Sequence, residues 1–157
     1  MKISKLDTKT PQDEGAFMHM TSPKFGHLMY TGPNADDEGR WTSEDQDPDP
    51  EAAVGLMVRG MEAQSVQEFT RAQQRKALTN AKKTNPTPQS DIDHENGIKF
   101  ACVLITDFVN IEDEAGDPLE PTEENKRWLI AMSDDISRQL LKFARDQDNF
   151  FDKPSSD

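Results

Sequence analysis

The fold is decided by residues 98–109, which read IKFACVLITDFV and form the most apolar stretch of the chain. Apolar residues three or four positions apart mark one face of a helix, and their apolar neighbours widen this face almost all round. A strand is the rival interpretation, because the run 103–105 is short and partly β-branched. The length of the stretch favours a buried helix over 98–109. Its main face carries Ile98, Ala101, Cys102, Ile105, Phe108 and Val109.

C-terminal to this stretch, the sequence predicts a helical hairpin. Residues 112–118 are acidic and read as a solvated turn, and Thr122 is the expected N-cap of a helix whose first turn holds two glutamates. Ser133 begins a second cap, followed by apolar residues at helical spacing. Phe150 and Phe151 stand at the exit, where they either fold onto the core or anchor a partner.

N-terminal to it, two short runs, 16–20 and 27–30, flank a turn with Pro23 and Gly26. This arrangement predicts a β-hairpin. Residues 54–58 resume strand character and would add a third strand to a small antiparallel sheet.

A basic helix is predicted between these parts. Ser65 and Glu68 fit a capping box, so the helix should begin there and run to about Lys83. Its cations gather towards its end, where they suit the helix dipole. Pro86 and Pro88 then stop it, because proline lacks the backbone amide.

Together these segments predict one α+β domain over 1–157, with a small N-terminal antiparallel sheet and three to four helices. The β-rich part would cover 15–60 and the helical part 64–151. The polar segments expected to be flexible are 1–14, 32–52, 84–93 and 152–157.

The charge balance limits the partners. Thirty acidic against eighteen basic residues give a formal charge of -12, which disfavours nucleic acid and anionic membranes. Basic partners or simple solubility fit better. The only cysteine, Cys102, excludes an intrachain disulfide and reads as a buried thiol. No apolar stretch approaches the roughly 18 residues that span a bilayer, and no secretion signal is seen, so we expect a cytoplasmic protein.

Motifs of catalysis and cofactor binding are missing from the sequence. There is no phosphate-binding glycine loop and no Gly-x-Ser-x-Gly. His19, His27 and His94 lie apart and lack metal-ligand spacing with Cys102. Residues 34–45 match a calcium loop poorly, because flanking helices and a bidentate glutamate are missing. We therefore expect no enzyme activity, no metal and no cofactor.

Two stretches carry a resemblance to a known family. The first comprises 3–8 (ISKLDT), 14–19 (EGAFMH), the Pro23 and Gly26 turn, and 28–30 (LMY). The second runs from 108–110 (FVN) through 116–125 (GDPLEPTEEN) to 143–146 (FARD) and 149–150 (NF). In this order and spacing the chain resembles the tail-assembly chaperones of tailed bacteriophages, siphophages and related prophages. It departs from them at 108–110, where a Trp-Gly type of sequence is expected.

The resemblance implies a non-catalytic protein that binds the tape-measure protein and the tail-tube subunit, and keeps their surfaces from associating prematurely. The candidate contact residues are Trp128, Leu129, Phe150 and Phe151. An ordinary core role is the alternative for all four. Two further functions stay open: a structural virion component, such as a capsid decoration or head–tail connector protein, and an acidic DNA mimic that inhibits a host protein.

Overall fold

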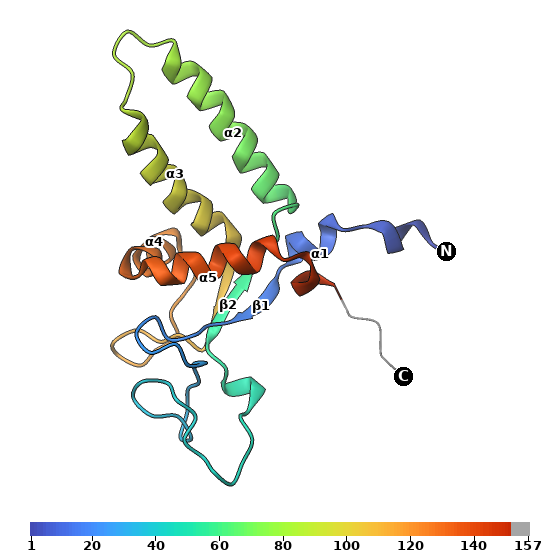
Figure 1. The fold of residues 1–157 in the computed structure, drawn as a ribbon, viewed down its shortest axis with the longest axis vertical. Coiled ribbons are helices and arrows are strands. Elements are labelled where there is room, and N and C mark those ends of the chain that lie inside the picture. Colours follow the sequence, from blue (N-terminus) through green and yellow to red (C-terminus); the bar gives the residue numbers. More distant parts are fainter. Residues whose placement is uncertain (152–157) are drawn as a thin grey trace.

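A three-stranded antiparallel sheet organises residues 1–151, the part of the chain that the computed structural model describes (Figure 1). Strands β1 (Ala16–His19), β2 (Gly55–Val58) and β3 (Ile105–Val109) lie in the order β1-β2-β3. The predicted α+β class is confirmed. The helices of this part are α1 (Lys9–Glu14), α2 (Gln64–Ala81), α3 (Gln89–Leu104), α4 (Glu123–Met132) and α5 (Asp134–Arg145), with short 3-10 turns η1 (Ile3–Leu6), η2 (Pro50–Ala52) and η3 (Gln147–Phe150).

The core lies between one face of the sheet and the helices. Met18, Leu56 and Phe108 stand opposite one another across the three strands, and all three are buried. Side chains alternate between the two faces of a strand, so their neighbours point the other way, and Phe17 and Asp107 are exposed. Leu104 and Leu140, from α3 and α5, complete the buried centre. Cys102 is buried as predicted.

The stretch 98–109 is half helix and half strand. Helix α3 ends at Leu104 and β3 starts at the next residue, so the predicted helix over 98–109 is wrong in its second half. Arg59 accounts for the change: its backbone amide donates to the Leu104 carbonyl at 2.7 Å, and its guanidinium donates to the Val103 carbonyl at 2.7 Å. These bonds satisfy carbonyls that a helix end leaves open, and place Ile105 beside β2.

The predicted hairpin of 16–20 and 27–30 does not form as a pair of strands. β1 pairs with β2 instead, while the second run makes only single bridges, Thr21 with Leu28 and Tyr30 with Ala53. The run 54–58 is confirmed as a strand, but it is the central one of the three. Pairing with β2 places Met18 opposite Leu56, and both side chains are buried.

The predicted helix starts are confirmed at two places and wrong at one. Thr122 accepts a hydrogen bond from the Asn125 amide at 3.1 Å, and Ser133 accepts one from the Asp135 amide at 3.2 Å. The capping box at Ser65 is absent, because the N-cap of α2 is Ala63, two residues earlier, and Ser65 lies inside the helix. The Ser65 hydroxyl donates to the Asp13 carboxylate at 3.4 Å instead.

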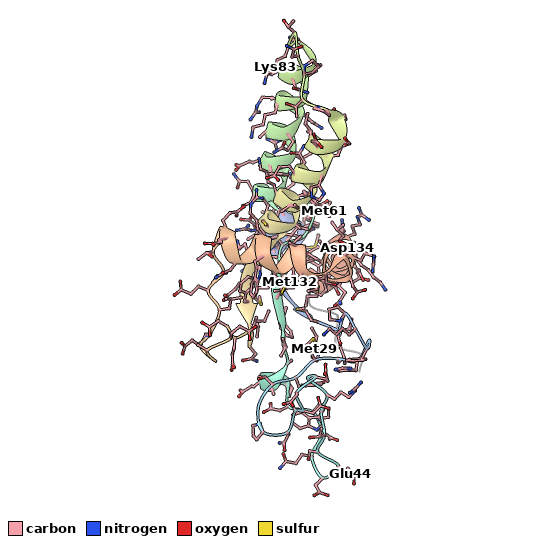
Figure 2. All side chains as sticks on the ribbon, turned by 90° about the vertical axis from the view of Figure 1, so that its left-hand side faces the viewer. Met29, Glu44, Met61, Lys83, Met132 and Asp134 are labelled. Atoms are coloured by element: carbon pink, nitrogen blue, oxygen red, sulfur yellow. The ribbon has the colours of Figure 1, made fainter. Side chains whose placement is uncertain are left out.

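Helices α2 and α3 project from the sheet as an antiparallel pair, and their connection forms one end of the molecule (Figure 1). Figure 2 places Lys83 at this end and Glu44 at the opposite end of the long axis. Within 32–52 the structure holds a bridge between Ala35 and Trp41 and the 3-10 turn η2. The predicted flexible tail 152–157 lies outside the described residues.

Candidate binding surfaces

The structure separates the four residues predicted to contact a partner. Trp128 on α4 is 48% exposed, whereas its neighbour Leu129 is 5% exposed and belongs to the core. Phe150 is 9% exposed and packs edge-on against Phe143, with ring centroids 5.7 Å apart. Phe151 is half-buried. The core interpretation therefore holds for Leu129 and Phe150, and Trp128 is the most accessible of the four.

Trp128 shares an exposed apolar face with Met132, which is not among the predicted contact residues. Met132 is 54% exposed and follows Trp128 by four positions, which puts both side chains on one face of α4. Leu129 and Ile130 bury the opposite face. Met132 is labelled in Figure 2 on the helix nearest the viewer. We call these two residues the α4 face. The spacing of four positions predicts that Trp128 and Met132 share a face of the helix, but the sequence does not tell whether this face is exposed or buried.

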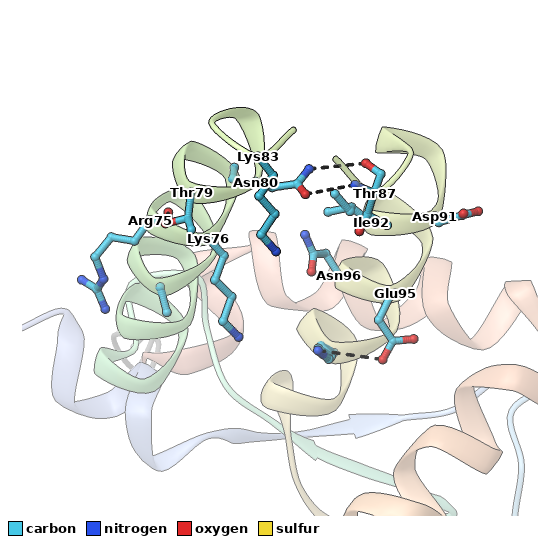
Figure 3. A pocket seen from close by; sticks show the side chains of 13 residues that line it. Arg75, Lys76, Thr79, Asn80, Lys83, Thr87, Asp91, Ile92, Glu95 and Asn96 are labelled. Carbon is cyan, nitrogen blue, oxygen red and sulfur yellow. Dashed lines mark hydrogen bonds and ion pairs between the residues drawn. The ribbon is translucent and has the colours of Figure 1, made fainter. Parts of the chain in front are cut away.

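A groove with a cavity volume of about 550 Å³ lies between α2 and α3 (Figure 3). Lys76 from α2 and Lys83 from the connection that follows it extend into the space between the helices, while Arg75 points away from α3. Near the tip, Asn80 ties α2 to the connection before α3: its side-chain amide donates to the Thr87 carbonyl at 3.3 Å and its side-chain oxygen accepts from the Thr87 amide at 3.1 Å. The groove is lined by four basic residues and two acidic ones: Arg75, Lys76, Lys83, Lys99, Asp91 and Glu95.

At the base of this groove an ion pair ties α3 to α4. Arg127 donates to the Glu95 carboxylate at 2.6 Å, and Lys99 lies 4.0 Å from the same carboxylate. The Arg127 hydrogen bond, reinforced by its charge, lowers the pKa of Glu95, and the same bond raises the pKa of Arg127. Glu95 is therefore an anion at neutral pH. Arg127 and Lys99 balance its charge at the base of the groove.

The cations of α2 were read from the sequence as partners of the helix dipole. Their continuity is the stronger signal: residues 69–90 hold five basic residues and no acidic one, in a chain whose formal charge is -12. Counting charge over a window would have found this segment. The side-chain directions around the groove could not be derived in the same way, because they depend on how α3 folds back against α2.

Within residues 1–151, no group of three or more histidine, cysteine or carboxylate side chains is placed to hold a metal ion. No helix of this part is long and apolar enough to cross a membrane. Comparison of the chain with protein-family models, with curated proteins and with solved structures finds no match in any of the three.

Proposed function

We propose that this chain is a non-catalytic assembly chaperone of a tailed bacteriophage, which binds the tape-measure protein or the tail-tube subunit in the cytoplasm of the bacterial host. The order of sequence motifs described above supports the family. The single structural observation that carries the proposal is the α4 face, where a tryptophan and a methionine stay exposed on a helix whose other side is fully packed.

Such a face suits an apolar helix of a partner. Tryptophan is enriched among the residues that dominate binding energy, and methionine adapts to varied apolar surfaces. A tryptophan side chain buries about 150–250 Å² when fully covered, so covering the exposed half of Trp128 removes about 100 Å² from water. At about 25 cal/mol per Å² this contributes about 2.5 kcal/mol, or roughly 60-fold in affinity.

The test is co-expression of this protein with the tape-measure and tail-tube proteins encoded beside it, followed by affinity capture and a solubility assay. Wild-type protein should retain one of the two partners and increase its solubility. Trp128→Ala should weaken capture by roughly 60-fold in affinity, and Met132→Ala by less. Leu78→Ala is the matched control, because Leu78 is 65% exposed on a different helix.

Three results would count against the proposal in different ways. Equal capture by wild type and Trp128→Ala would remove the α4 face as the contact surface. Capture lost equally in Leu78→Ala would point to a general effect on the protein. If neither partner is retained and mass spectrometry finds the protein in purified virions, a structural virion component replaces the chaperone.

A further inference from the structure

The chain carries two segments of opposite charge. Residues 69–90, which we call the basic arm, hold Arg71, Arg75, Lys76, Lys82 and Lys83 and no acidic residue. Residues 36–51, which we call the acidic loop, hold eight acidic residues and one basic residue, Arg40. Outside the basic arm, thirty acidic and thirteen basic residues give a formal charge of -17. The arm is therefore a local reversal of the sign of the molecule.

These charges are not neutralised inside the described part of the molecule. All five basic side chains of the arm and all eight acidic residues of the loop are exposed. The ion pairs found within residues 1–151 involve Glu95, Lys99, Glu123, Arg127, Asp135 and Arg138, and none of these belongs to either segment. Arg40, the one cation of the loop, lies over the Phe25 ring at 5.0 Å from its centroid.

The two segments lie at opposite ends of the long axis. Lys83 marks one end and Glu44 the other in Figure 2, and Figure 1 shows the same arrangement from a view turned by 90°. One copy cannot bring its own arm to its own loop, because the sheet and the helices α4 and α5 lie between them. Two copies placed end to end can do so.

We propose that the basic arm of one copy docks on the acidic loop of a second copy, in a head-to-tail contact between molecules. Lys76 and Lys83 reach into the groove between α2 and α3, whose lining also holds the carboxylates of Asp91 and Glu95. Arg127 pairs with Glu95, so the two lysines remain for carboxylates of the loop. Glu44, Asp45 and Asp47 lie in the part of the loop without helix or strand, so they can follow the shape of the groove. This contact goes beyond the proposed chaperone role and uses a different surface.

A second copy is favoured over nucleic acid as the occupant. A phosphate backbone long enough to follow the basic arm also meets the rest of the molecule, whose formal charge is -17. The acidic loop is short and lies at one end of the molecule. It can therefore approach the basic arm of a second copy while the remaining, acidic parts of the two copies stay apart. Because the contact joins two different surfaces, each copy keeps one free arm and one free loop, and the assembly extends or closes as a ring.

The experiment is sedimentation velocity of the full chain over a range of concentrations at about 0.1 M and about 1 M NaCl, where the Debye length is about 10 Å and about 3 Å. Wild-type protein should show a mass that grows with concentration at the lower salt and returns to that of the monomer at the higher. Monomer alone at every concentration in the lower salt would overturn the proposal.

Charge reversal identifies the surfaces. The arm variant Lys82→Glu/Lys83→Glu and the loop variant Glu44→Lys/Asp45→Lys should each weaken self-association by about tenfold or more. Mixing the two should restore it, because each variant then offers the other a complementary pair. All four positions are exposed, and circular dichroism checks that both variants fold. The matched control for the arm is Lys2→Glu/Lys5→Glu, an equal charge change at exposed positions elsewhere.

The mixture decides between this contact and a general charge effect. Self-association that the reversals leave unchanged, that the control weakens equally, or that mixing fails to restore would refute the contact. A labelled single-stranded DNA oligonucleotide that binds wild type and not the arm variant, with the protein itself monomeric, would make the arm a nucleic-acid site instead. None of these results depends on the α4 face, so this proposal and the chaperone proposal fail separately.

Discussion

The same substitution at two glycines should have opposite effects on stability. Gly55 lies in β2, buried beside β1, and a Cβ atom there would stand 2.0 Å from the Met18 carbonyl oxygen and 2.7 Å from a ring carbon of Phe17. Gly97 lies inside α3, is exposed, and has no atom within 4 Å of the corresponding position. Neither glycine has a positive φ, so the difference comes from space alone.

The magnitudes follow from these distances. Gly55→Ala requires β1 to move by about 1 Å, because a contact of 2.0 Å with backbone is not tolerated. Overpacking of this kind costs about 1–3 kcal/mol, and more where paired strands must separate. Gly97→Ala should stabilise by about 0.5–1 kcal/mol, because alanine favours a helix interior over glycine. The two variants should therefore differ by about 1.5–4 kcal/mol.

Urea unfolding followed by circular dichroism measures this difference directly. The slope of the free energy of unfolding against urea should stay the same in both variants, so that the midpoint reports stability. In a thermal scan Gly97→Ala should unfold about 1–4 °C above wild type. Equal stability of the two variants, or a Gly55→Ala protein as stable as wild type, would refute the close approach of β1 to β2 at this position.

Three further outcomes are expected. Leu140→Ala should lower the free energy of unfolding by about 2–5 kcal/mol, and Leu78→Ala should change it by less than about 0.5 kcal/mol, because Leu140 is fully buried and Leu78 is exposed; similar urea midpoints would contradict the packing. The pKa of Glu95 is lowered by Arg127, so the pair stabilises the fold above the unfolded pKa and is lost as pH falls through the folded pKa. Glu95→Gln should therefore make the melting temperature fall less steeply as the pH drops below about 4.5. An unchanged fall would exclude the Glu95–Arg127 pair as a cause of the acid destabilisation. Burial raises the pKa of Cys102, so iodoacetamide should react with it at least about tenfold more slowly in native than in urea-unfolded protein, and equal rates would show that the thiol is accessible.

The features that could be predicted from sequence are those decided by neighbours in the chain. The caps at Thr122 and Ser133 depend on amides two or three residues away, and a short window contains both partners. The cap at Ser65 failed for the opposite reason, since its hydroxyl bonds Asp13, 52 residues earlier. No reading of the local pattern contains that competitor.

The division of 98–109 has the same origin. Its helical and strand halves are both apolar, and the change between them at Ile105 is set by hydrogen bonds from Arg59 and by pairing with β2. The prediction of contact residues was limited for the same reason. The sequence marks Trp128 and Leu129 as neighbours on α4, but only the packing of α4 decides that Leu129 faces the core. Burial is a property of the assembled layers rather than of the segment.

Net charge predicts partners only at long range, for a physical reason. A formal charge of -12 describes the molecule at distances larger than its own size, whereas at physiological salt the Debye length is about 8 Å. Helix α2 has 18 residues and is therefore about 27 Å long, so a ligand at its tip is screened from most of the acidic body. The charged residues near the tip include Lys82 and Lys83, which follow α2, and Asp91 in the first turn of α3. The prediction that nucleic acid and anionic membranes are disfavoured therefore rests on the acidic remainder of the molecule, whereas at the basic arm we expect an acidic segment of a second copy to bind.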